Sequence, residues 1–228
     1  MNNINKYYNL ERSREFISQN KHRDIVGGLW DEIGRLQFDF LVQQGLKPEM
    51  KLIDIGCGCL RGGVHFVDYL DAQNYYGTDI SEDLLNVGYN EEISKLKLKE
   101  KLNRNHLLQD SEFNFSSFDV TFDFAIALSL FTHLPLNHVR LCLYRLAHKV
   151  NNGGVFCATF FLLDHNPEEW SEPVLHSPSG ITTFPASDPY HYTETDLQYC
   201  VDGLPWELEI VGECKHPRDQ KMVIFRKY

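Results

Sequence analysis

The chain of 228 residues lacks several features that assign a protein to a specialised class. Its longest mostly apolar stretch, Gly153–Leu163, is too short to cross a bilayer as a helix. Residues 1–6 have no apolar core like that of a secretory signal, and no repeat or linker divides the chain. These absences exclude membrane-spanning and collagen-like classes, and they predict a cytoplasmic protein with no membrane partner.

Basic residues are also scarce, because 22 Lys and Arg face 32 Asp and Glu and the net charge is −10. An acidic surface repels phosphate, so no nucleic-acid partner is expected unless a local basic patch escapes this count. The cysteines have no disulfide-framework spacing, which favours reduced thiols at all six positions: Cys57, Cys59, Cys142, Cys157, Cys200 and Cys214.

Apolar stretches of strand type alternate with helical periodicity after an N-terminal arm, which we place at residues 1–28. A single domain is expected over residues 29–228. The expected strands are 51–55, 75–79, 107–108, 122–131, 155–163, 207–214 and 221–226, and the main expected helices start near Leu29, Val64, Ser81, Leu136 and Thr193. This alternation predicts an α/β fold with a doubly wound, mostly parallel sheet that ends in an antiparallel hairpin.

One connection is unusually long, from Asp164 to about Tyr192, and it is rich in Pro, Ser and His. Because plain connections are shorter, we expect this 164–192 segment to have a function. The next residues, Thr193-Glu194-Thr195-Asp196, have the pattern of a capping box that opens a helix.

A Gly-rich turn follows the first strand, at the place where ligands bind in such sheets. Gly56 and Gly58 permit a tight turn and let a ligand approach the backbone closely. Asp79 ends the second strand, where a carboxylate can accept both hydroxyls of a ribose. The pattern therefore favours a nucleoside-bearing ligand over a simple strand–helix connection.

Two kinds of nucleoside ligand remain open at this point. A dinucleotide fingerprint needs its third glycine where Arg61 stands, although Gly62 offers a relaxed variant. A nicotinamide-dependent oxidoreductase is therefore the alternative enzyme class. A non-catalytic cofactor-binding protein would also keep the Gly-rich turn.

Five segments follow one another in the order of a known set of motifs. They are Asp54-Ile55-Gly56-Cys57-Gly58, Asp79, Asp110, the strand and loop Phe122–Leu134, and Gly153-Gly154. Through them the chain, over about residues 30–227, resembles the class I S-adenosylmethionine-dependent methyltransferases. The resemblance implies a Rossmann-like seven-stranded sheet whose antiparallel C-terminal strand is Lys221–Arg226.

The resemblance also implies a role for individual residues toward S-adenosylmethionine, whose product is S-adenosylhomocysteine. The backbone at Gly56 and Gly58 would face the methionine part and Asp54 its amino group, while Asp79 would hold the ribose. Asp110 and the adjacent Ser111 would meet the adenine. The complete predicted cofactor-binding set is Asp54, Gly56, Gly58, Asp79, Ile80, Asp110, Ser111 and Ser129.

The sequence of the loop after the fourth strand restricts the class of methyl acceptor. Amine methylators of this family carry Asn/Asp-Pro-Pro-Tyr there, whereas this chain has Ser129-Leu130-Phe131-Thr132. Clustered acids of metal-dependent catechol-type members cannot be placed either. By elimination, we expect an O-methyltransferase acting on a hydroxyl of a small-molecule or glycan acceptor, with no metal.

A hydroxyl needs a base near neutral pH, and histidine titrates in that range. His133 is the first candidate because it follows the fourth strand, where the family's methyl-accepting atom sits. His191, at the end of the 164–192 segment, is the second. The pair Cys57-x-Cys59 lacks the further ligands of a zinc site. The sequence names neither the acceptor nor the oligomeric state.

Overall fold

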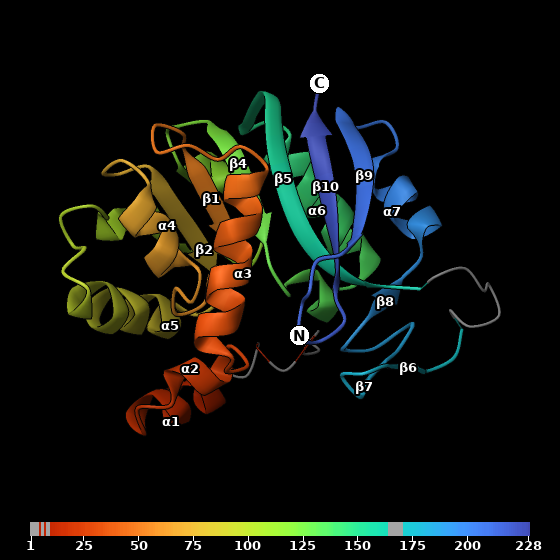
Figure 1. The fold of residues 1–228 in the computed structure, drawn as a ribbon, viewed down its shortest axis with the longest axis horizontal. Helices are drawn as coiled ribbons and strands as arrows, with labels where there is room; N and C mark the ends of the chain where they lie inside the picture. The colour runs from red at the N-terminus through yellow and green to blue at the C-terminus, as the bar shows by residue number, and fades with distance from the viewer. Residues whose placement is uncertain (1–4, 6, 8–9, 164–170) are drawn as a thin grey trace. The chain divides into compact units, whose positions relative to one another are not determined.

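The computed structural model describes residues 5, 7, 10–163 and 171–228, and the chain forms two compact units. The N-terminal unit is Tyr7–Ile126, and the C-terminal unit combines Ala127–Tyr228 with the first residues of the chain, Met1–Lys6. Figure 1 labels the helices and strands of both units. The division into an arm at 1–28 and a domain at 29–228 remains a prediction.

The N-terminal unit is built on a parallel sheet in the order β3-β2-β1-β4. Its strands are β1 (Leu52–Ile55), β2 (Tyr75–Asp79), β3 (Leu107–Gln109) and β4 (Phe122–Ala127). All four residues of β1 are buried, as expected for a central strand covered on both faces. The carboxyl ends of β1, β2 and β3 therefore lie along one edge of this sheet.

Helices connect these strands because parallel strands need crossover connections. α3 and α4 pack together on the sheet, and α5 packs beside β2 and β3 (Figure 1). Ser81 caps α5 as predicted, since its side chain accepts a hydrogen bond from the Leu84 amide at 3.2 Å. The helices of this unit are α1 (Leu10–Ser18), α2 (His22–Ile25), α3 (Trp30–Gln43), α4 (Gly63–Tyr69), α5 (Glu82–Val87), a π-helical turn (Gly88–Ile93) and two 3₁₀ turns (Arg104–His106 and Phe115–Ser117).

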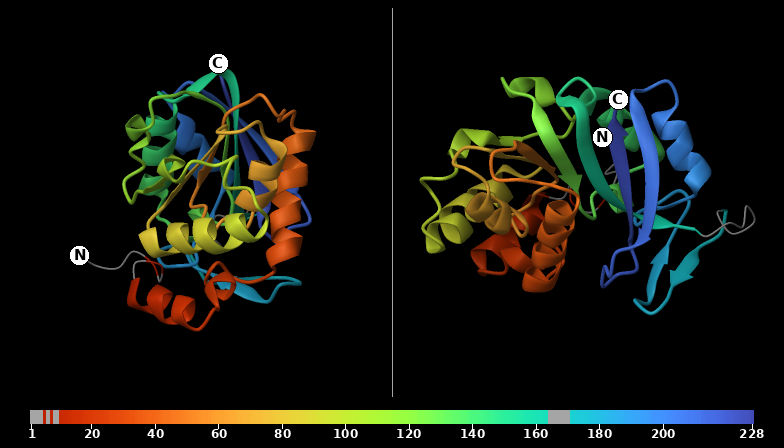
Figure 2. Two further views of the ribbon diagram at one scale, coloured as in Figure 1. Left: turned by 90° about the vertical axis from the view of Figure 1, so that its left-hand side faces the viewer. Right: turned by 45° about the horizontal axis from the view of Figure 1, so that its top comes forward.

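The C-terminal unit contains the antiparallel part of the fold. β10 (Lys221–Lys227) lies between β5 (Val150–Leu162) and β9 (Trp206–Glu213) and is antiparallel to both, as Figures 1 and 2 show. α6 (Leu136–Leu146) and α7 (Glu194–Val201) pack against each other, and the predicted capping box at Thr193 is present. The predicted α/β class, mostly parallel with an antiparallel C-terminal strand, is thus confirmed.

Three short strands organise the connection between β5 and α7. β6 (Val174–His176) and β7 (Ile181–Thr183) form a hairpin, and β8 (His191–Tyr192) pairs with the end of β5. Part of the 164–192 segment, residues 164–170, lies outside the described residues. Among the described helices, none has the length and apolarity of a membrane span.

Three local expectations differ from the structure. The fifth strand begins at Val150 rather than at residue 155. The fourth strand ends at Ala127 rather than continuing to Phe131, because Ser129 adopts a left-handed backbone with φ of +57° and a 3₁₀ turn follows at Phe131–His133. Residues 1–28, where no helix was expected, contain α1 and α2. Residues 1–4, 6 and 8–9 lie outside the described part.

Candidate functional site

The Gly-rich turn follows β1 and is bound to the end of β2. The amides of Gly56 and Cys57 both donate to the carbonyl of Thr78, at 2.8 and 3.0 Å. Gly56 and Gly58 have φ of +76° and +55°, a region in which other residues are strained. The turn thus has two positions without a side chain at the edge of the sheet, of which Gly56 is partly exposed.

Asp79 joins this turn to the end of β2. Its Oδ2 accepts a hydrogen bond from the Gly58 amide at 2.8 Å, and its Oδ1 accepts one from the Ser81 amide at 2.9 Å. Burial raises the pKa of Asp79 to about 6, although these two hydrogen bonds oppose the rise. Since a carboxylate has about four lone-pair sites, two remain for a ligand.

Asp54 lies in β1, directly before the turn, and is only 4% exposed. The hydroxyl of Tyr75 donates to its Oδ2 at 2.8 Å. Burial raises the pKa of Asp54 to about 7, and the nearby charge of Asp79 adds to the rise. A cationic group bound beside Asp54 would favour its ionised form, because opposite charges within a few ångströms stabilise one another.

The loop after β3 meets the end of β2 through its backbone. The Asp110 amide donates to the Asp79 carbonyl at 2.9 Å. The Asp110 carboxylate accepts from the amides of Glu112 and Asn114, at 2.8 and 2.6 Å, and so shapes its own loop. Ser111 is exposed beside it, and the Ile80 carbonyl accepts from the Gln109 side chain.

Seven of the eight residues predicted to bind the cofactor therefore lie along the carboxyl ends of β1, β2 and β3, where ligands bind in such sheets. The eighth, Ser129, belongs to the C-terminal unit. Binding of a cofactor by these eight residues remains a proposal.

An N-terminal segment, residues 22–28, covers the Gly-rich turn. The Arg61 guanidinium donates to the carbonyls of Val26 and Gly28, at 2.8 and 3.1 Å. A Cβ on Gly58 would stand 2.6 Å from Cγ1 of Val26, so glycine is also required there by close packing. In the sequence Arg61 only interrupts a glycine pattern, whereas in the structure it binds residues 22–28 to the turn.

An ionic cluster holds the same segment from its other end. Glu92, in the π-helical turn, is 3% exposed; it accepts from Arg23 at 2.8 and 2.6 Å and contacts the His22 ring at 2.7 Å. Burial opposes ionisation of Glu92, but the hydrogen bonds from Arg23 and His22 outweigh it and lower the pKa. Residues 22–28 are thus fixed by charge at one end and by Arg61 at the other.

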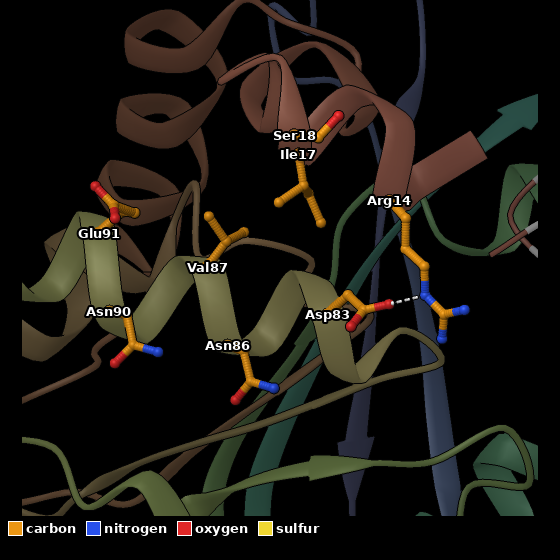
Figure 3. A pocket seen from close by; sticks show the side chains of 8 residues that line it. All are labelled: Arg14, Ile17, Ser18, Asp83, Asn86, Val87, Asn90 and Glu91. Carbon is orange, nitrogen blue, oxygen red and sulfur yellow. Dashed lines mark hydrogen bonds and ion pairs between the residues drawn. The ribbon is translucent and has the colours of Figure 1, made fainter. Parts of the chain in front are cut away.

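A separate groove runs between α1 and α5 (Figure 3). Its volume is about 390 Å³, and an exposed ion pair between Arg14 and Asp83, at 2.8 Å, stands at one end. None of the predicted site residues lines it; the lining residues are Arg14, Ile17, Ser18, Asp83, Asn86, Val87, Asn90 and Glu91.

In the C-terminal unit, His133 occupies the 3₁₀ turn that follows β4 and Ser129. Its Nδ1 lies 2.5 Å from Oδ1 of Asp188, and both side chains are 15% exposed. The His133 carbonyl accepts from the side chain of Asn5 at 2.7 Å. The ring is therefore held by a carboxylate from the 164–192 segment, which the sequence did not predict.

His191 has a different environment. It is 5% exposed, and its Nδ1 lies 2.9 Å from the hydroxyl of Thr183, which in turn lies 2.9 Å from Nε2 of His176. This hydrogen-bonded chain ties β8 to the β6–β7 hairpin. Its burial is typical of a structural histidine.

Ser129 takes part in a third network of buried polar groups. Its hydroxyl donates to Oε1 of Gln220 at 2.9 Å, and its amide donates to the Thr159 hydroxyl at 2.7 Å. His216 lies 3.3 Å from the same hydroxyl. The hydrogen bonds from the amide and hydroxyl of Ser129 explain how this non-glycine residue is kept in a left-handed conformation.

The cysteines are free, and those beside the Gly-rich turn are chemically quiet. Burial raises the pKa of Cys59 to about 12 and that of Cys57 well above its usual range, which keeps both thiols protonated. In the part of the chain that the structure describes, no group of three or more His, Cys, Asp or Glu side chains is arranged to hold a metal ion. Metal independence itself remains a prediction.

Comparison with known proteins places the site in context. A family model described as a methyltransferase domain matches residues 53–156, which include the Gly-rich turn, Asp79, Asp110 and His133.

Several solved structures share the fold at low sequence identity. Magnesium protoporphyrin IX methyltransferase from Synechocystis PCC 6803 with bound S-adenosylmethionine is 15% identical, with 95% of this chain and 96% of that chain covered and a TM-score of 0.62. An S-adenosylmethionine-dependent methyltransferase from Clostridium acetobutylicum is 10% identical, with 95% and 99% covered and a TM-score of 0.64. A candidate rRNA-methylase from Clostridium thermocellum is 12% identical, with 86% and 96% covered and a TM-score of 0.57.

Proposed function

We propose that the chain is a class I S-adenosylmethionine-dependent methyltransferase that methylates a hydroxyl of a small molecule or sugar, with His133 as the general base. The observation that carries this proposal is the position of His133 and the carboxylate that contacts its ring. It follows β4 within a few residues, and its ring is oriented by a carboxylate without being fully buried.

The residues at the ends of β1, β2 and β3 fit the cofactor. Gly56 leaves its backbone partly exposed and Gly58 shapes the turn beneath Val26. Asp79 keeps two lone-pair sites for ribose hydroxyls, and buried Asp54 gains from a cationic amino group. We assign Asp110, Ser111 and Ile80 to the adenine and ribose, and Ser129 is the remaining residue of the proposed cofactor-binding set. S-adenosylmethionine supplies that methyl group as a sulfonium.

The chain's own residues then orient the acceptor and move one proton. Displacement at a methyl group needs in-line alignment and exclusion of water more than covalent help. His133 takes the hydroxyl proton as the oxygen attacks, which contributes about 10²–10⁴-fold to such reactions. His191 is the second candidate, and its burial beside Thr183 makes it the weaker one.

The proposed class of acceptor rests on two observations, the sequence of the loop after β4 and the net charge of the chain. Ser129-Leu130-Phe131-Thr132 stands where amine methylators have Asn/Asp-Pro-Pro-Tyr, and a net charge of −10 disfavours an RNA acceptor. The candidate rRNA-methylase among the similar structures makes RNA the alternative that the test must include.

The test has two arms. Calorimetry should detect binding of S-adenosylmethionine and S-adenosylhomocysteine but not NADH; binding of NADH alone would overturn the cofactor assignment. Release of S-adenosylhomocysteine should then be measured with phenols, sugars, primary amines and total RNA as acceptors. Turnover confined to the amines or to RNA would refute the proposed hydroxyl acceptor.

A further inference from the structure

We infer that Asp188 is a positioning residue that selects the proton-accepting tautomer of His133, an inference that rests on the proposed function. The pair joins two distant parts of the C-terminal unit, the turn after β4 and the end of the 164–192 segment. Nothing in the sequence pattern singled out Asp188.

The contact is supported by a set of bonds that dock one segment onto the other. The Tyr190 amide donates to the Thr132 carbonyl at 2.7 Å. The Tyr192 hydroxyl donates to the carbonyls of Phe131 and Leu134 on the same turn. The side chain of Asn5 holds the His133 carbonyl as well. Both the carboxylate and the ring are therefore carried by backbone that is fixed in place.

The chemistry of the contact determines the tautomer. An ionised carboxylate only accepts hydrogen bonds, so the His133 nitrogen that faces Asp188, Nδ1, must carry the proton. In the neutral ring, Nε2 then has the lone pair. Without the carboxylate, the neutral imidazole is free to place its proton on either nitrogen, and the form with the proton on Nε2 cannot accept another there.

The same contact stabilises the charge that the reaction creates. As the acceptor oxygen bonds to the methyl carbon, the carbon–sulfur bond breaks with its electron pair left on sulfur, and the hydroxyl proton passes to Nε2. His133 then carries a positive charge while its Nδ1 lies 2.5 Å from the Asp188 carboxylate. Because both side chains are 15% exposed, the pair is less screened than an ion pair on the surface.

Nitrogen-15 spectroscopy of histidine-labelled protein with bound S-adenosylhomocysteine tests the tautomer without an acceptor. A His133→Gln variant assigns the signal. We expect protonated Nδ1 and unprotonated Nε2 in the wild type, a mixture of tautomers in Asp188→Asn, and the wild-type pattern in Asp188→Glu and in the exposed control Asp202→Asn. A wild-type ring protonated on Nε2, or an unchanged spectrum in Asp188→Asn, would overturn the assignment; the wild-type spectrum alone decides if the variant does not fold.

Turnover separates this inference from the function on which it rests. With the phenols and sugars of the acceptor panel, Asp188→Asn should lower kcat about 10- to 100-fold and leave KM near normal, since it removes orientation but not the base. A tautomer that shifts while no hydroxyl is ever methylated would leave Asp188 assigned and refute the proposed function. A loss of kcat with an unchanged tautomer would refute the role of Asp188.

Discussion

The Gly58 amide donates to Oδ2 of Asp79 at 2.8 Å, so the Gly-rich turn and the acid that ends β2 form one structural unit. The carboxylate orients the turn through one oxygen and begins α5 through the other, by way of the Ser81 amide. A residue that the sequence marks as a ligand for ribose is thus also a support for the backbone beside it.

Asp79→Ala should weaken binding of S-adenosylmethionine by about 1–3 kcal/mol, because ribose hydroxyls lose a charged and partly buried acceptor. Isothermal titration calorimetry measures the effect, with the exposed Asp119→Asn as the matched control. Since Asp79 also holds Gly58, thermal melting must accompany the titration. An unchanged dissociation constant in a folded variant would remove Asp79 from the site.

Asp54→Asn should stabilise the folded protein at alkaline pH and weaken its binding of S-adenosylmethionine. A buried acid whose pKa is raised from 3.8 to about 7 binds its proton more tightly when folded, so stability falls as pH rises from about 4 to 7. The variant removes this penalty, and we expect a gain of about 1–3 kcal/mol at pH 8.

Urea unfolding of the ligand-free protein at pH 4.5 and pH 8 measures this difference. The gain should largely disappear at the lower pH, where Asp54 is protonated and resembles the amide. The same titration predicts that affinity for S-adenosylmethionine rises with pH between about 5 and 8. A variant less stable than the wild type at pH 8 would contradict the interpretation.

Glu92→Gln should destabilise the N-terminal unit by about 1–3 kcal/mol at pH 7, because it leaves Arg23 and His22 without their charged partner. The pKa of Glu92 is lowered in the folded protein, so its contribution is present above pH 4.5 and is lost as pH falls through the folded pKa. Chemical unfolding at pH 7 and pH 3.5 should show the difference narrowing. Glu91→Gln, which removes only an exposed ion pair with Lys95, should change stability by less than about 1 kcal/mol.

His133→Ala should lower turnover about 10²–10⁴-fold while cofactor affinity stays near normal. His191→Ala should instead lower the melting temperature, because it leaves the buried Thr183 hydroxyl with fewer partners. Steady-state kinetics and melting curves of both variants distinguish the two histidines. Loss of turnover only in His191→Ala would move the base to the 164–192 segment, and a fewfold effect in both would mean that alignment and desolvation carry the reaction.

Turnover should not depend on a metal ion. The described residues contain no cluster of three or more potential ligands, and the buried thiols of Cys57 and Cys59 stay protonated. Activity measured before and after treatment with EDTA should be the same within error. Activity abolished by EDTA and restored by magnesium would show that the prediction is wrong.

Local patterns in the sequence were sufficient to predict most of the helices and strands and the position of the Gly-rich turn and Asp79 at strand ends. Strand period, the cap at Ser81 and the capping box at Thr193 are short-range signals that depend on neighbours in the chain. The Gly-rich turn and Asp79 were found because both stand at strand ends, and parallel strands bring their carboxyl ends to one edge.

Only the tertiary structure decided which distant residues meet. Ser129 is held left-handed by Thr159 and Gln220, so β4 ends earlier than its apolar run predicts. The contact of His133 with Asp188 spans 55 residues, and that of Arg61 with Val26 spans 35. Such pairs depend on where loops fold back and pack, which no local period encodes, whereas a strand or a capped helix is specified by residues a few positions apart.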